Sequence, residues 1–140
     1  MKIVQQLLDP KSLRAVCKSL KYMDSGSSRR VYRLNKTRVL KVASSKRGFE
    51  QNKYEVFVYN SVGDSLVARI YWYAPDYKWL ISEYLDESDT TCRQESRVMS
   101  GIIRSGIHID EMHEFGKDSK GRVKLLDYGL SSEIYNKYYR

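Results

Sequence analysis

Two short β-rich segments constrain the fold of this chain more than any other feature. Residues 31–34 (VYRL) and 39–43 (VLKVA) flank the polar segment 35–37 (NKT). Two such runs separated by a few polar residues, with an Asn among them, predict an antiparallel hairpin. The chain therefore contains a β-sheet, and the hairpin places Lys41 inside an apolar strand.

The remaining segments predict helices and further strands around this hairpin. Asp9 and Pro10 are typical of an N-cap and a first helical turn, and Gly63 follows a run with helical spacing. We expect a short turn before residue 10, a loop over 24–28, helices near 10–20, 49–62 and 89–104, and strands near 66–73, 78–84 and 123–126. Together they predict one α+β unit, in which a five-stranded antiparallel sheet within residues 20–84 packs against the 49–62 helix, with the 89–104 helix beneath it.

Composition excludes several classes of protein. With 140 residues, 41% hydrophobic and 30% charged, the chain can form a core and does not have a disordered composition. It has no apolar run of the length that a membrane helix needs, and the apolar stretch at its N-terminus is too short for a secretory signal. We therefore expect a cytoplasmic protein with no membrane partner. Two cysteines without a CxxC motif indicate neither a disulfide framework nor a zinc site. The net charge of +8 favours acidic or phosphate-rich partners.

A series of short motifs follows in a characteristic order. The chain presents, in turn, a Gly/Ser loop at 26–28 followed by Val31, the strand 39–42 with Lys41, the helical segment 51–55 with Glu55, the segment 80–85 (LISEYL), the triplet 108–110 (HID) and the segment 126–130 (LDYGL). This order resembles the protein-kinase-like family over about residues 20–130. The resemblance implies a small lobe with a five-stranded sheet and one packed helix, followed by a truncated helical second lobe.

The resemblance also implies a role for each motif. Phosphoryl transfer depends mainly on positioning and charge neutralisation, so a lysine must hold phosphate oxygens and an aspartate must hold magnesium. Lys41 and Asp127 match these two tasks, Glu55 would pair with Lys41, and Asp110 would accept a hydrogen bond from the attacking hydroxyl. The implied nucleotide-binding residues are Gly26, Ser27, Ser28, Lys41, Glu55 and, in the hinge, Glu83. ATP and magnesium are the implied cofactors.

The sequence departs from the family pattern in three places. Only the middle glycine of the phosphate loop is present, since Asp24 and Arg29 occupy the positions of its neighbours. The asparagine expected five positions after Asp110, a second metal ligand, is absent. The chain also ends soon after Asp127, which predicts that most helices of the larger lobe are missing. These departures predict impaired phosphoryl transfer.

We therefore expect a single truncated kinase-like domain that acts mainly as a partner-binding, pseudokinase-type module. Its parts would be an N-terminal helical segment (1–19), a small lobe (20–85) and a reduced second lobe (86–140). Such short versions resemble accessory proteins of bacterial viruses, which would place the chain in a host cytoplasm. An active small ATP-dependent protein kinase is the first alternative.

A nucleic-acid-binding protein is the second alternative, and it depends on the basic hairpin. Positive side chains at this density can neutralise phosphates, and Tyr32 can stack on a base. An ordinary solvated strand face is the plainer interpretation of the same charges. The hairpin residues assigned to partner binding, protein or nucleic acid, are Arg29, Arg30, Arg33, Lys36 and Arg38.

Overall fold

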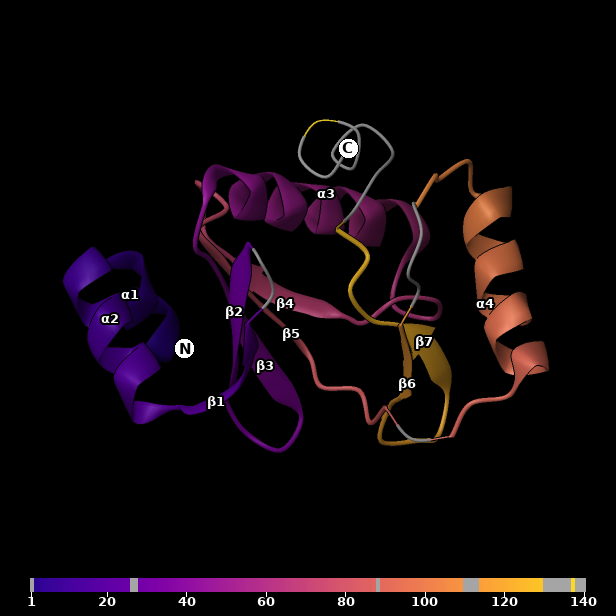
Figure 1. Cartoon of the computed structure of the whole chain (residues 1–140), viewed down its shortest axis with the longest axis horizontal. Helices are drawn as coiled ribbons and strands as arrows, with labels where there is room; N and C mark the ends of the chain where they lie inside the picture. Colours follow the sequence, from indigo (N-terminus) through magenta and orange to yellow (C-terminus); the bar gives the residue numbers. More distant parts are fainter. Residues whose placement is uncertain (1, 26–27, 88, 110–113, 130–136, 138–140) are drawn as a thin grey trace.

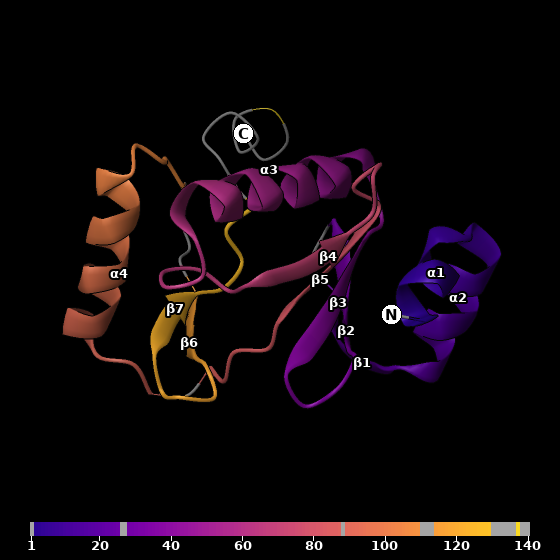
Figure 2. The same cartoon turned by 180° about the vertical axis from the view of Figure 1, so that it is seen from behind.

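The computed structural model describes residues 2–25, 28–87, 89–109, 114–129 and 137. Figure 1 shows three parts along the long axis of the molecule. A pair of N-terminal helices lies at one end, a β-sheet with one long helix lies in the middle, and a second helix with a small sheet lies at the other end. The view from behind in Figure 2 gives the same arrangement.

The central sheet has five antiparallel strands, as the sequence predicted. They are β1 (Lys21–Ser25), β2 (Arg29–Arg33), β3 (Arg38–Ala43), β4 (Ile70–Tyr73) and β5 (Trp79–Glu83), in the order β1-β2-β3-β5-β4. The predicted hairpin joins β2 to β3 and pairs Val31 with Lys41. β4 is shorter than the expected 66–73, and β1 extends into residues expected to be a loop.

The long helix α3 (Lys46–Val62) covers one face of this sheet (Figure 1). Its N-cap is Ser45, whose hydroxyl accepts a hydrogen bond from the backbone N–H of Gly48 at 3.4 Å. The helix ends at Gly63, which has a φ of 80° that favours glycine. Sequence patterning placed the C-terminal end of this helix correctly and its start three residues late.

The opposite face of the sheet is covered by helices α1 (Lys2–Leu8) and α2 (Pro10–Ser19). Asp9 caps α2, as predicted, but the segment before it forms a helix where a turn was expected. Tertiary contacts explain this difference. Leu7 is buried in a cluster with Leu13, and its carbonyl accepts a hydrogen bond from the indole N–H of Trp79 at 2.9 Å.

The second lobe contains helix α4 (Cys92–Arg104) and the antiparallel pair β6 (Phe115–Lys117) and β7 (Val123–Leu125). Thr91 begins α4 with a capping box to Gln94. β7 matches the strand expected near 123–126, whereas β6 was not predicted, and the two strands together give the lobe a small sheet. Leu125 forms a parallel bridge with Val67, which joins this lobe to the core beneath α3. None of the helices in the described part of the chain has the length and apolar character needed to cross a membrane.

Candidate functional site

A buried group of charged side chains lies between the sheet and α3. The Nζ of Lys41 is 3.0 Å from Glu55 Oε1 and 3.0 Å from Asp127 Oδ1. These residues come from β3, from α3 and from the segment after β7, so three distant parts of the sequence meet here. The structure thus brings together Lys41, Glu55 and Asp127 of the predicted site.

The alternation of side chains along β3 explains why Lys41 is buried. Successive residues of a strand point to opposite faces, so Leu40 and Val42 face the N-terminal helices while Lys41 faces α3. Glu55 lies on the buried side of α3 and is 0% exposed. A buried carboxylate and a buried ammonium each need a partner of opposite charge, and each supplies it to the other.

Arg29 is a fourth member of this group. Its guanidinium contacts Glu55 Oε2, lies 3.6 Å from Asp127 Oδ1 and donates a hydrogen bond of 3.1 Å to Asn52 Oδ1. The Arg29 side chain is only 10% exposed. The sequence predicted Arg29 on the basic surface of the hairpin, but the structure places it in the interior. Strand alternation places Arg29 on the same face as Val31, the partner of Lys41, but it does not say which face is buried.

The four groups balance one another electrostatically. The Lys41 ammonium holds the pKa of Asp127 well below its ordinary value, with a smaller contribution from Arg29, although burial alone would raise it. Burial alone would lower the pKa of Arg29, but Glu55 and Asp127 outweigh it and raise that pKa. Asp127 and Arg29 are therefore ionised at neutral pH, within a group of two basic and two acidic side chains.

The two residues after Asp127 fix its position. Tyr128 is fully buried, and its hydroxyl donates a hydrogen bond of 2.6 Å to the carbonyl of Ala68. Gly129 passes so close to α3 that a Cβ there would lie 2.6 Å from the carbonyl oxygen of Gln51. Only glycine allows this approach, and the approach holds Asp127 against Lys41.

A cavity of about 260 Å³ opens beside this group. Its apolar walls include Val31, Val39, Ala68 and Leu126, and Lys41 and Asp127 lie at its edge. Glu83, predicted in the hinge, also lines it.

The carboxylate of Glu83 is already engaged. Its Oε1 accepts hydrogen bonds from the Nζ of the buried Lys124 at 2.8 Å and from the backbone N–H of Arg69 at 3.2 Å. Lys124 Nζ also lies 3.6 Å from Asp118 Oδ2. Glu83 therefore links β5 to the β6–β7 sheet.

The other predicted site residues are placed differently. Gly26, Ser27 and Asp110 lie outside the described residues. Ser28 is buried, and its hydroxyl bonds to the side chain of Gln51 on α3 rather than facing the cavity. The position five residues after Asp110 holds Phe115 at the start of β6. Among the described residues, no group of three or more His, Cys, Asp or Glu side chains is arranged to hold a metal ion.

The basic side chains of the hairpin do not form one surface. The guanidinium of Arg33 stacks on the ring of Tyr84 at 3.5 Å, and that of Arg38 stacks on the ring of Tyr71 at 4.1 Å. Arg30 and Lys36 are exposed, and Arg30 lines a cavity on the opposite face of the sheet from Lys41.

Comparison with known proteins gives a likeness at the level of structure. SAICAR synthase from Saccharomyces cerevisiae, in complex with SAICAR, has a TM-score of 0.53 at 12% sequence identity, covering 78% of this chain and 73% of that one. The ternary complex of streptomycin, ATP and APH(2")-IIa has a TM-score of 0.48 at 18% identity, covering 74% of this chain and 43% of that one. The fold of this chain is kinase-like. No protein-family model and no curated protein matches the sequence, so the likeness concerns the fold alone.

Proposed function

We propose that this chain is a nucleotide-binding, kinase-like protein that acts mainly by binding a partner and transfers phosphate weakly. The position of Lys41 is the observation that carries the proposal. A buried ammonium held at 3.0 Å by both Glu55 and Asp127, at the edge of a cavity, is pre-organised to bind phosphate oxygens.

The described residues fit the parts of a nucleoside triphosphate. Val31, Val39 and Ala68 offer apolar walls for a base, and Lys41 offers positive charge for phosphates. Asp127 is the carboxylate beside them, and Mg²⁺ is commonly held by one or two carboxylates together with the phosphates of its nucleotide. Magnesium would supply neutralisation of phosphate charge at this edge of the cavity.

Two observations favour weak transfer over efficient catalysis. Phe115 stands where the family pattern has a metal-binding asparagine, so a second metal ion lacks that ligand. Arg29 and Lys41 already neutralise the charges of Asp127 and Glu55. Binding of a protein partner is therefore the main role that we propose. An active protein kinase and a nucleic-acid-binding protein stay alternatives, and a cytoplasmic location stays a prediction.

The first test is nucleotide binding by wild type and Lys41→Met. A ligand that binds only the folded state stabilises it, so saturating ATP with magnesium should raise the melting temperature of wild type by about 5–11 °C at 100-fold excess over Kd. Lys41→Met should lose this shift. Lys36→Met removes an exposed lysine from the same hairpin and should keep it.

A second measurement distinguishes loss of nucleotide binding from loss of stability in the Lys41 variant. Binding of a fluorescent ATP analogue, followed below the melting temperature of every variant, should also be lost in Lys41→Met alone. Equal binding by Lys41→Met and wild type would refute the site. Turnover of labelled ATP that Asp127→Ala abolishes, at a rate typical of kinases (about 1–100 per second), would refute the weak-transfer part and support the active kinase.

A further inference from the structure

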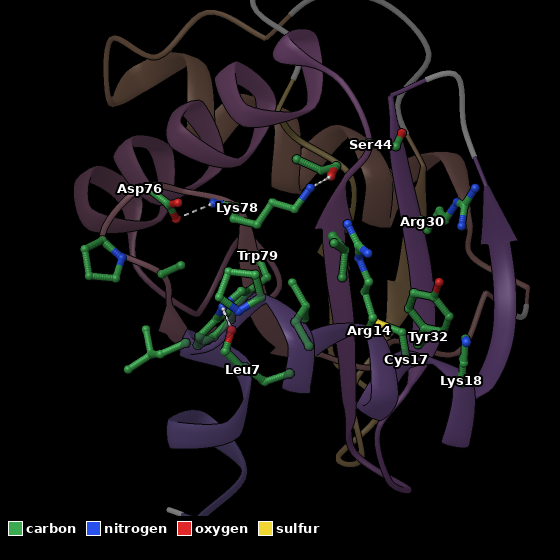
Figure 3. Close-up of a pocket in the computed structure, with 17 residues that line it drawn as sticks. Leu7, Arg14, Cys17, Lys18, Arg30, Tyr32, Ser44, Asp76, Lys78 and Trp79 are labelled. Atoms are coloured by element: carbon green, nitrogen blue, oxygen red, sulfur yellow. Dashed lines mark hydrogen bonds between the residues drawn. The ribbon is translucent and has the colours of Figure 1, made fainter.

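A larger cavity, of about 840 Å³, lies between the N-terminal helices and the sheet (Figure 3). It lies on the opposite face of the sheet from the 260 Å³ cavity beside Lys41. Val42 lines the larger cavity and the adjacent Lys41 lines the smaller one, and successive residues of a strand point to opposite faces. Its volume falls within the range of about 300–1,000 Å³ that is typical of small-molecule sites. It plays no part in the function proposed above.

The floor of this cavity is apolar and built from fixed elements. Leu13 from α2, Tyr32 from β2 and Trp79 from β5 line it, and all three side chains are at least nine-tenths buried. The hydrogen bond from the Trp79 indole to the Leu7 carbonyl ties α1 to the sheet. The walls are therefore held together without a ligand.

The rim carries an excess of positive charge. Four cationic side chains line the cavity, and they are Arg14, Lys18, Arg30 and Lys78. Among the described residues that line the cavity, Asp76 alone is acidic, and its carboxylate accepts a hydrogen bond of 3.0 Å from the backbone N–H of Lys78.

Three of these cations have no counter-charge among the residues that the structure describes. The Nζ of Lys78 donates to the carbonyl of Ala43 at 2.7 Å, whereas Arg14, Lys18 and Arg30 form no ion pair with any residue in the described ranges. An apolar floor beneath unpaired cations complements a ligand that is apolar at one end and anionic at the other.

We propose that this cavity binds a small amphipathic organic anion, whose apolar body lies against Tyr32 and Trp79 and whose carboxylate or similar anionic group pairs with Arg14 and Arg30. The apolar body contributes binding free energy through burial, and the cations select for negative charge.

The chain contains its own reporter and its own control. Cys17 lines the cavity and is half-buried, whereas Cys92 is exposed at the start of α4, at the other end of the molecule (Figure 1). These are the only two cysteines of the sequence. A bound ligand should therefore shield one thiol and leave the other unchanged.

The experiment measures the labelling rate of each thiol by N-ethylmaleimide, using peptide mass spectrometry. The probe is decanoate below its micelle concentration, and decanol is the uncharged control of the same chain length. We expect decanoate to slow the labelling of Cys17 in a saturable manner, with no change at Cys92. Decanol should protect Cys17 only at about tenfold higher concentration or more, because it cannot pair with the arginines.

A double variant tests the rim. Arg14→Gln with Arg30→Gln should weaken decanoate protection by about tenfold, while Arg93→Gln with Arg97→Gln, two exposed arginines of α4, should leave it unchanged. Equal protection by decanol and decanoate in wild type would refute the anion site even if the double variant fails to fold. Absence of protection, or equal slowing at both cysteines, would refute it as well. Protection of Cys17 by ATP at lower concentration than by decanoate would also overturn the proposal, since the cavity would then take a nucleotide.

Discussion

Arg29 changes what the buried charged group can do. Lys41 with Glu55 and Asp127 alone would leave one negative charge to attract a divalent cation, but Arg29 brings the group to two cations and two carboxylates. Lys41 and Asp127 line the cavity, whereas Arg29 does not line it and contacts Glu55 and Asp127 instead. Arg29 occupies the position of a loop glycine in the family pattern, and its positive charge offsets the carboxylates that would repel a phosphate at Lys41.

Glu55→Gln tests how strongly this group supports the fold. The substitution leaves Lys41 and Arg29 buried with Asp127 as their remaining carboxylate, and the side chain of Asp127 is 42% exposed. We expect the free energy of unfolding at pH 7 to fall by about 3–5 kcal/mol, as when one partner of a buried ion pair is removed. Urea denaturation followed by tryptophan fluorescence measures it.

The control is Glu50→Gln on the same helix. Glu50 pairs with Lys137 at 2.9 Å in a partly exposed position, so its loss should cost less than about 1 kcal/mol. Similar losses for the two variants would mean that Glu55 has no special role.

Sequence order predicted three of the four charged residues, and the reason for the exception is physical. Lys41, Glu55 and Asp127 stand in motifs whose spacing is visible in the sequence. Arg29 stands in a row of basic residues, and strand alternation alone separates the row into two faces without saying which face is buried. Which face is buried depends on where α3 packs. The packing of α3 against Arg29, through Glu55 and Asn52, is a property of the tertiary structure.

At the scale of elements, N-cap residues in the sequence predicted the helices that begin with them. α2 begins at the Asp9–Pro10 pair and α4 begins after a Thr that forms a capping box, so both lie close to the predicted ranges. α1 and β6 have seven and three residues, and no such signal marks either one. Their stability depends on contacts with distant residues, Trp79 for α1 and β7 for β6, which a pattern within one segment does not contain.

Gly129→Ala tests the close approach of the segment after β7 to α3. The added Cβ would lie 2.6 Å from the Gln51 carbonyl and 2.9 Å from Glu55 Oε2, so the segment must move away from the helix. We expect a loss of about 1–3 kcal/mol in unfolding free energy, with weaker ATP binding because Asp127 moves with the segment. Denaturation and fluorescent nucleotide binding measure the two effects.

The matched control is Gly101→Ala inside α4. Its Cβ would meet only the end of the flexible Leu66 side chain at 2.9 Å, and alanine favours a helix over glycine by up to about 1 kcal/mol. This variant should be neutral or more stable than wild type. A Gly129→Ala protein with unchanged stability and nucleotide binding would contradict the role of the close approach.

At the scale of the whole molecule, the sheet separates two apolar clusters, and charged groups connect the second lobe to it. One cluster lies beneath the N-terminal helices, and the other lies between α3, α4 and β7. Two ion pairs make the connection. One second-lobe carboxylate forms the first pair, and another lies beside the second pair. Asp127 bonds to Lys41 of β3, and Asp118 lies 3.6 Å from Lys124, which bonds to Glu83 of β5.

These carboxylates predict that acid loosens the second lobe before it loosens the sheet. The Lys41 ammonium lowers the pKa of Asp127, and hydrogen bonds from Arg122 and Lys120 lower that of Asp118 although its burial opposes them. Because both folded-state pKa values lie below the ordinary value of 3.8, the two ionised groups contribute their full stability above about pH 5 and lose it progressively as the pH falls below about 4.

Hydrogen exchange, corrected for the intrinsic rate at each pH, should therefore show residues 114–129 losing protection between pH 5 and pH 3 while β2, β3 and β5 keep theirs. The variant Asp127→Asn should have less protection than wild type in this segment at pH 7 and a shallower dependence on acid, since it has lost one of the two titrating groups. If the sheet and the second lobe lose protection together, or if Asp127→Asn follows the wild-type acid profile, then these two carboxylates do not hold the lobe in place.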